Sequence, residues 1–94
     1  MPDSSSQWFV YILECADKTL YIGMTNNVEK RVNAHNNTNA SRYTRGRRPV
    51  KLRYFEQCED KSSALKREAA LKKINRAEKL VLIKKFKWRG VRAV

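Results

Sequence analysis

The sequence predicts an α/β fold, a single domain built on a three-stranded, mainly antiparallel sheet. The chain of 94 residues is long enough for one hydrophobic core and too short for two. Residues 8–15, 20–24 and 50–55 are rich in β-branched and aromatic types, which is typical of strands. The last third of the chain carries apolar residues at helical spacing instead. We therefore expect a β-hairpin, a helix, a third strand and two further helices, in that order.

The two ends of the chain differ in composition from its middle. Residues 1–7 are polar and offer nothing to bury, so we expect a disordered leader. Residues 8–88 are the predicted domain, and residues 89–94 a basic C-terminal tail. No stretch approaches the roughly 20 apolar residues of a membrane-spanning helix, and the first residues lack the pattern of a secretory signal. We expect a cytoplasmic protein that has no membrane partner.

The length of the hairpin loop decides whether Tyr11 and Tyr21 share a face of the sheet. Successive side chains of a strand point to opposite faces, so a change of one residue in the loop reverses the relationship. A three-residue loop over residues 16–18 places both tyrosines on one face and requires a left-handed backbone at Lys18. A two-residue loop separates them.

A capping pattern starts the first predicted helix. Asn26 stands three residues before Glu29, which is the spacing of a capping box, and predicts a helix over residues 27–36. Helical spacing then places Arg31 and His35 on one face. Taken alone, this pair is better explained as a solvated helix edge than as a phosphate clamp.

Two more helices are predicted after the third strand, which should span residues 50–58. Asp60 is expected to cap a helix from residue 61 to about residue 74. The apolar stripe of this helix would consist of Ala64, Leu65, Ala69, Leu71 and Ile74. Asn75 repeats the capping spacing and starts a last helix that should end near Trp88.

The chain is strongly basic, with 21 lysines and arginines against 9 acidic residues and a formal charge of +12. Self-repulsion of this size is tolerated mainly when the partner is a polyanion, which favours nucleic acid. A basic surface without a function is the alternative, because either sign of charge keeps a protein soluble. Residues 36–49 lack apolar periodicity and are predicted to form a basic loop.

Glu68 is the most informative residue of the helix predicted over residues 61–74. Helical spacing places it inside the stripe that should face the sheet, where a carboxylate is costly unless it is paired or binds a cation. One explanation is an ion pair with Lys72 or a nearby arginine. The other is a shared site, since the hairpin and the first helix should pack beside this helix. Such a cleft would contain Tyr11, Tyr21, Arg31, His35 and Glu68.

The order of these residues along the chain resembles the pattern of the GIY-YIG nuclease family. Val10-Tyr11-Ile12 corresponds to the first tripeptide, with valine in place of glycine, and Tyr21-Ile22-Gly23 matches the second in full. Arg31, His35 and Glu68 then follow in the order of the family.

The resemblance covers residues 9 to about 86, and residues 43–50 resemble a small stand-alone bacterial subgroup in particular. It implies a sheet flanked by helices, a basic cleft that grips a phosphate, and one divalent ion held by Glu68. Mg²⁺ is the expected ion, with Mn²⁺ as a substitute, because such hard cations prefer oxygen ligands and keep several waters. The small size leaves room for a partner protein or a homodimer that would direct the domain to its substrate.

The same resemblance implies catalytic roles for the matched residues. Tyr11 and Tyr21 would flank the attacking water, and a cluster of cations would lower the pKa of a tyrosine. Arg31 would stabilise the phosphoryl oxygens. His35 would assist proton transfer or hold the phosphate, and Glu68 would bind the metal.

A second group of residues is assigned to nucleic-acid binding: Gly23, Arg42, Tyr43, Arg45, Arg47 and Arg48. Gly23 would allow a close approach, although glycine after a strand commonly serves a turn or bulge. Tyr43 would either stack on a base or cover the apolar edge of the sheet.

Two functions follow from the sequence. The first is a metal-dependent endonuclease that hydrolyses DNA, structure-selective or weakly specific because no separate domain reads sequence. The second is a non-catalytic basic module that binds DNA or RNA and retains the nuclease fold. Many relatives carry a further polar residue on a later helix, and the nearest here, Asn75, is better explained as a cap, which favours the second. DNA is favoured over RNA as the partner.

Overall fold

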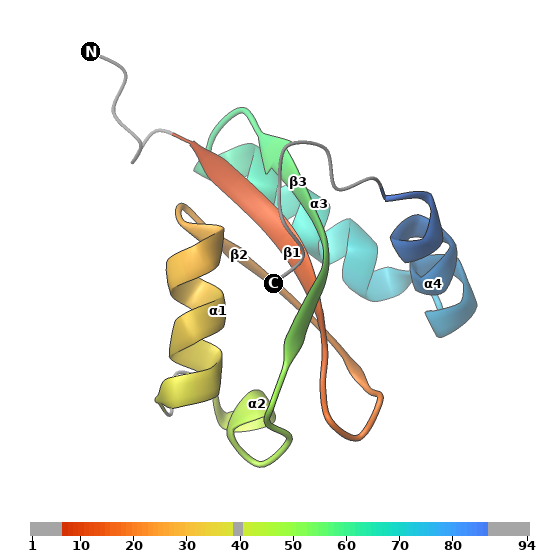
Figure 1. Cartoon of the computed structure of the whole chain (residues 1–94). Coiled ribbons are helices and arrows are strands. Elements are labelled where there is room, and N and C mark those ends of the chain that lie inside the picture. Colours follow the sequence, from red (N-terminus) through yellow and green to blue (C-terminus); the bar gives the residue numbers. More distant parts are fainter. Residues whose placement is uncertain (1–6, 39–40, 87–94) are drawn as a thin grey trace.

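The computed structural model describes residues 7–38 and 41–86 of the chain (Figure 1). Its antiparallel sheet has the order β2-β1-β3, with strands β1 (Trp8–Glu14), β2 (Leu20–Thr25) and β3 (Lys51–Cys58). The described helices are α1 (Val28–Asn37), α2 (Arg42–Arg45), α3 (Lys61–Lys73) and α4 (Arg76–Lys85). The predicted fold class and the order of the predicted elements are confirmed.

The sheet separates two hydrophobic clusters, and each face is covered by helices. On one face α1 packs Val28 and Val32 over a cluster that includes Tyr11. On the other face α3 packs Ala64 and Leu71 over a cluster that includes Val10, Ile12 and Ile22. Figure 1 shows α1 on one side of the sheet and α3 with α4 on the other. The central strand β1 is therefore buried on both faces.

The hairpin between β1 and β2 has the three-residue loop, over residues 16–18. Lys18 adopts a φ of 72°, which is the left-handed conformation that this loop requires at its third position. The register pairs Tyr11 with Gly23. Residues paired across antiparallel strands project to the same face, and Tyr21 lies on the face of Gly23, so both tyrosines share one face.

The cap of α1 lies one residue later than predicted. Asn27, and not Asn26, accepts a hydrogen bond from the backbone N–H of Lys30 at 3.0 Å. The reason is that β2 continues through Thr25, whose hydroxyl oxygen accepts from the backbone N–H of Asn27 at 3.1 Å. Asn26 therefore lies in the turn between β2 and α1.

The predicted caps mark the starts of α3 and α4, but the buried stripe of α3 differs from the prediction. Asp60 caps α3, and Asn75 forms a complete capping box at α4. Leu65, placed in the stripe, is 51% exposed, and Ala69 is also exposed. Helical spacing explains this, because the buried face passes through residues 64, 68 and 71, and the two misplaced residues lie beside it.

Two further predictions differ from the structure or lie outside it. Residues 36–49 were expected to be a loop throughout, but they contain the short helix α2. The last helix ends at Lys85, earlier than expected. Trp88, residues 1–6 and the tail 89–94 lie outside the described residues. In the described part of the chain, no helix combines the length and the apolarity needed to cross a membrane.

Candidate active site

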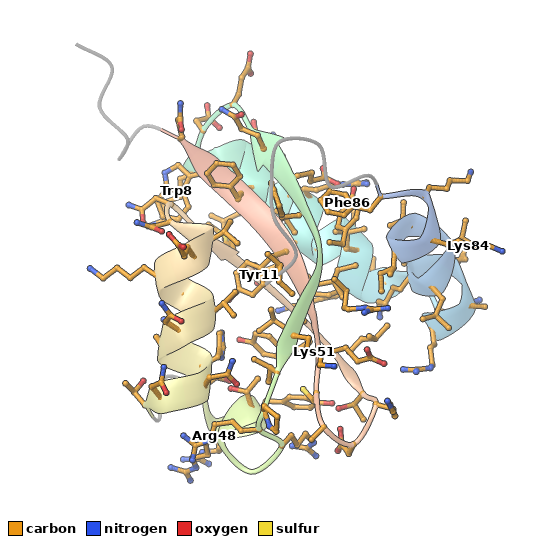
Figure 2. The ribbon with its side chains drawn as sticks, viewed as in Figure 1. Trp8, Tyr11, Arg48, Lys51, Lys84 and Phe86 are labelled. Carbon is orange, nitrogen blue, oxygen red and sulfur yellow. The ribbon has the colours of Figure 1, made fainter. Side chains whose placement is uncertain are left out.

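Tyr11 lies in the middle of the sheet and is 1% exposed (Figure 2). Its ring passes over Gly23, and a β-carbon at Gly23 would collide with the phenol oxygen and with a ring carbon. In the structure the group that approaches this glycine closely is Tyr11, whereas the sequence assigned Gly23 to nucleic-acid binding. The glycine fixes where the phenol group lies.

His35 connects Tyr11 to a residue that the sequence did not single out. It is fully buried on the inward face of α1, with Nε2 3.1 Å from the Tyr11 hydroxyl oxygen. Its Nδ1 lies 2.8 Å from the hydroxyl oxygen of Thr44, which belongs to α2 and is also fully buried. Thr44 was missed because α2 was predicted as loop, where a threonine beside an arginine is unremarkable.

Burial sets the pKa values of this pair. Desolvation raises the pKa of Tyr11 to about 12; hydrogen bonding from Arg31 opposes the rise, and the charges of Tyr21 and Glu68 add to it. Desolvation, helped by the charge of Arg31, lowers the pKa of His35 to about 4. Both groups are neutral at pH 7. The expectation that cations would lower the pKa of a tyrosine is wrong for Tyr11, because burial outweighs them.

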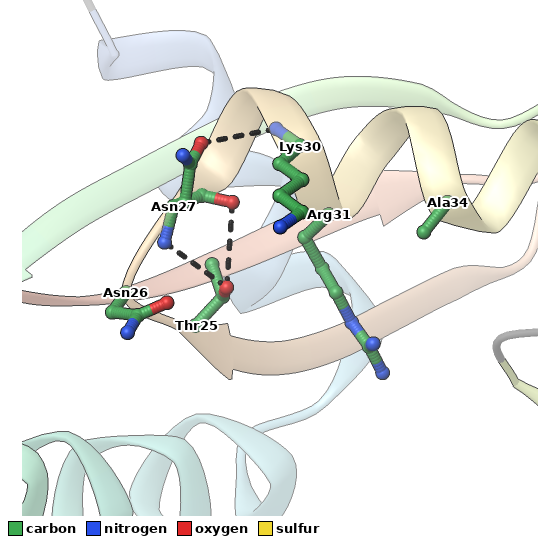
Figure 3. A pocket seen from close by; sticks show the side chains of 6 residues that line it. All are labelled: Thr25, Asn26, Asn27, Lys30, Arg31 and Ala34. Carbon is green, nitrogen blue, oxygen red and sulfur yellow. Dashed lines mark hydrogen bonds between the residues drawn. The ribbon is translucent and has the colours of Figure 1, made fainter. Parts of the chain in front are cut away.

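Arg31 brings an unpaired donor to the same place. Its Nε is buried and has no hydrogen-bond partner among the described residues, which is costly in a folded protein. Arg31 also lines a pocket of about 230 Å³ at the start of α1, together with Thr25, Asn26, Asn27, Lys30 and Ala34. In Figure 3 its side chain extends from α1 across β2. An oxygen anion bound here would satisfy the donor.

Tyr21 completes this face through ring contacts. Its ring centroid lies 5.2 Å from that of His35 and 6.5 Å from that of Tyr11. Tyr43 stacks on Tyr21 at 5.6 Å, and the Arg47 guanidinium lies 4.1 Å from the centroid of Tyr43. Of the two explanations for Tyr43, these contacts favour the one in which it covers the sheet.

Glu68 approaches the site from α3. Its side chain is 19% exposed and lies 3.4 Å from Nζ of Lys72, so the predicted ion pair is present. Its charge also contributes to the raised pKa of Tyr11. Lys72 is 57% exposed, and an ion pair with such a partner is weak. The carboxylate can therefore exchange Lys72 for another cation at small cost.

The donor set decides which metal would fit. The described residues contain no cluster of three or more histidine, cysteine or acidic side chains that could hold an ion. Glu68 alone offers one hard oxygen ligand. This suits Mg²⁺ or Mn²⁺, which can complete their coordination with water and phosphate oxygens. A zinc site, with three or four protein ligands, is not built here.

The four arginines around α2 divide into two pairs. Arg47 donates to the Asp17 carboxylate at 3.0 Å and to the carbonyl of Tyr43 at 2.8 Å. Arg48, at the α2 end of the molecule in Figure 2, donates to the carbonyls of Arg45 and Thr38 at 3.0 and 3.2 Å. These two hold the segment together.

The other pair, Arg42 and Arg45, is exposed. Neither guanidinium has a hydrogen bond or ion pair within residues 7–38 and 41–86. Of the four, these two are therefore available for a phosphate.

Paired tyrosines on one face of a small sheet, with a helix arginine and a carboxylate from a later helix, form the arrangement that the resemblance to a nuclease family implies. Residues 7–81 match the family described as GIY-YIG catalytic domain. The chain belongs to the GIY-YIG family, as its tripeptides predict.

Its relatives place it within a group of small proteins. The UPF0213 protein CPE1444 of Clostridium perfringens is 57% identical over 75 residues, which cover 80% of this chain and 81% of the relative. A UPF0213 protein of Syntrophus aciditrophicus is 56% identical over 80 residues, covering 84% and 92%. The solution NMR structure of the UPF0213 protein BH0048 from Bacillus halodurans is 35% identical, covers 83% of both chains and has a TM-score of 0.54. The predicted small subgroup is thereby confirmed.

Proposed function

We propose that this protein is an endonuclease that hydrolyses phosphodiester bonds in DNA, acting in the cytoplasm with structure-selective or weak specificity. Membership of the GIY-YIG family supports the nuclease class. The observation that carries the proposal is the surrounding of the Tyr11 hydroxyl. It is hydrogen-bonded to His35, interacts with Arg31, whose buried Nε has no partner among the described residues, and is affected by the charge of Glu68. Side chains that could serve as a base, an anion binder and a metal ligand would thus act on one reacting position.

The neutral states of Tyr11 and His35 define how such a site would activate water. Burial disfavours both phenolate and imidazolium, so neither should accumulate before attack. The water would give a proton to Tyr11 while the proton of Tyr11 passes to Nε2 of His35. The resulting hydroxide forms the new bond to phosphorus, one bridging P–O bond breaks, and the leaving oxygen takes a proton from solvent. His35 then releases its extra proton readily, because its pKa is low.

Arg31 and Glu68 would act on the phosphate group itself. The buried Nε of Arg31 would donate to a non-bridging oxygen and gain the partner that it lacks. Glu68 would hold Mg²⁺ or Mn²⁺ after releasing Lys72. When bound, the ion supplies positive charge that stabilises the oxygens of the transition state.

Arg42 and Arg45 would bind the phosphate backbone, since their guanidiniums have no partner among the described residues, and the formal charge of +12 would attract the polyanion. DNA is proposed over RNA as the substrate. Phosphate contacts do not read sequence, so selection would rest on the shape of the DNA, on a second copy of the chain or on a partner protein.

The test is cleavage by the purified protein of branched, nicked and single-stranded DNA, with Mg²⁺ or Mn²⁺. Glu68→Gln keeps the size of the side chain and removes its charge, so it should abolish cleavage while the protein still folds and binds DNA. Glu78→Gln, at the cap of α4, is the matched control and should cleave normally. Cleavage by the natural protein no greater than that by Glu68→Gln, on every substrate and with both metals, would refute the proposal.

A second candidate is a binding module that no longer cuts. Two observations favour it. The pKa of about 12 for Tyr11 makes the phenolate scarce at neutral pH, and Glu68 is already paired with Lys72. Under this proposal Glu68→Gln changes neither DNA nor RNA binding, and no substrate is cleaved. Binding should still weaken with salt, because phosphate contacts release counterions.

A further inference from the structure

Thr44 is the residue of α2 that reaches the site. It lies between two exposed residues, Tyr43 and Arg45, and is itself 0% exposed. Its hydroxyl oxygen is 2.8 Å from Nδ1 of His35 and 3.5 Å from the carbonyl oxygen of Ser41. A buried hydroxyl in this position must be satisfied by its neighbours, so its contacts fix where protons can lie.

Two arrangements of protons fit the distances around His35. In the first, Nδ1–H donates to Thr44, and the hydroxyl of Tyr11 donates to Nε2. In the second, the hydroxyl of Thr44 donates to Nδ1, and Nε2–H donates to Tyr11.

The neighbouring groups favour the first arrangement. The carbonyl of Ser41 can only accept, so it takes the proton of Thr44 when Thr44 accepts from Nδ1. The hydroxyl of Tyr11 has one hydrogen-bond partner among the described residues that can accept a proton, Nε2 of His35. If its oxygen accepted a proton from Nε2–H, its own buried proton would need another acceptor, and no hydrogen bond of the described residues provides one. Only the first arrangement gives each of the protons on Thr44, His35 and Tyr11 an acceptor among the described residues.

We propose that Thr44 is a positioning residue, which holds His35 in the tautomer protonated at Nδ1 and so keeps Nε2 free to accept the proton of Tyr11. The tautomer stands independently of the proposed nuclease activity; its catalytic consequence rests on that proposed function.

A hydroxyl suits this task better than the carboxylate found in many histidine-containing sites. A carboxylate orients the ring and also stabilises imidazolium, which raises the pKa of histidine. Thr44 orients the ring without adding negative charge. The titratable and charged groups that face His35, namely Tyr11, Tyr21 and Arg31, include no carboxylate. His35 therefore stays a neutral acceptor until Tyr11 loses its proton.

The direct test is ¹⁵N NMR of the full-length protein at pH 7. The chain has one histidine, so both ring nitrogens can be assigned without ambiguity. We expect Nδ1 to carry the proton and Nε2 to be unprotonated in the natural protein and in Thr44→Ser. Thr44→Val, which removes the hydroxyl at similar volume, should shift the ring toward a mixture of tautomers. Protonated Nε2 in the natural protein overturns the proposal, whatever the variants do.

The control is Thr38→Val, at the far end of α1, where the hydroxyl donates to the carbonyl of Ala34 at 2.7 Å. It should leave the tautomer of His35 unchanged. A change of tautomer as large as that in Thr44→Val would assign the effect to α1 and overturn the proposal. If Thr44→Val does not fold, Thr44→Ala and the natural protein still decide the tautomer.

Cleavage gives a second measurement, which also separates the two proposals. Thr44→Val should lower kcat by at least about tenfold with KM little changed, since a histidine in the wrong tautomer can cost up to about 10⁴-fold. Thr44→Ser should recover most of the rate. Unchanged kcat in a folded Thr44→Val protein overturns the catalytic part of the inference. If the natural protein does not cleave but the tautomer is as expected, the proposed function fails and the positioning of His35 stands.

Discussion

The phenol of Tyr11 occupies the space that a side chain at Gly23 would fill. The two residues are register partners in β1 and β2, so the relationship is set by the backbone of the sheet. Because Tyr11 is buried, its ring cannot simply turn away into solvent. The last residue of the second tripeptide thus determines the position of the tyrosine in the first.

Gly23→Ala should therefore destabilise the fold by about 1 to 3 kcal/mol, the usual cost of forcing a methyl group into a packed interior. It should also reduce cleavage, since Tyr11 is displaced from His35. Urea denaturation measures the first effect. Gly46→Ala is the control, because a β-carbon there meets nothing within 4 Å and the φ of −96° suits any residue. Equal destabilisation by the two substitutions would contradict the account.

The low pKa of His35 makes folding sensitive to acid. The folded value, about 4, lies below the ordinary 6.5, so the unfolded chain binds the proton first as the pH falls. Stability from this residue is complete above about pH 6.5 and is lost toward pH 4, by roughly 3 kcal/mol in total. Urea denaturation from pH 7 to pH 4 measures it.

His35→Gln removes this titration and should flatten the slope between pH 6.5 and pH 4. Asp17 and Asp60 remain in both proteins, and hydrogen bonds from Thr19 and Ser63 lower the pKa values of their carboxyl groups. Their contribution to the stability of the fold is lost at lower pH. An unaltered slope in His35→Gln would show that His35 titrates normally.

The arginines around α2 should separate into two phenotypes. Arg45→Ala should leave the urea midpoint unchanged, weaken DNA binding, and reduce the slope of log Kd against log salt by about 1 for the lost phosphate contact. Arg47→Ala should lower the urea midpoint, because it loses Asp17, the Tyr43 carbonyl and the Tyr43 ring. Asp17→Asn, which breaks the ion pair alone, should show a smaller shift. Reversed phenotypes for Arg45 and Arg47 would refute the division.

Arg31→Met is expected to separate activity from stability. Methionine keeps much of the aliphatic packing and removes a buried donor that lacks a partner, so stability should be unchanged or higher by up to about 1 kcal/mol. Cleavage should be lost if that donor serves the phosphate. Urea denaturation measures the stability and single-turnover cleavage measures the activity, both on one preparation of the variant. A strong loss of stability would indicate that Arg31 has a structural role instead.

The fold could be predicted because its signals are local. Strand-forming residues mark β1 to β3 where the structure has them. Asp60 marks the start of α3, and Asn75 marks the start of α4. The shared face of the two tyrosines depended on loop parity, which composition left open until the backbone of Lys18 decided it.

The parts that were missed depend on tertiary contacts. The helix α2 has four residues and no apolar periodicity, and Thr44 is buried in contact with His35, which belongs to another helix. The pKa of Tyr11 was predicted in the wrong direction for a similar reason. Positive charge is visible in a sequence, whereas the depth at which a strand residue is buried depends on the helices that cover the sheet.

Two contacts join segments that lie far apart in the chain: Asp17 of the hairpin turn with Arg47, and Tyr43 with Tyr21 of β2. The contact of Arg47 with the Tyr43 ring connects the two. They hold α2 against the sheet before any ligand arrives. Arg42 and Arg45 are therefore presented by a preorganised platform, and docking a phosphate backbone need not include the entropy loss of ordering that segment. Association should accordingly be limited by encounter and charge rather than by a slow rearrangement of the protein.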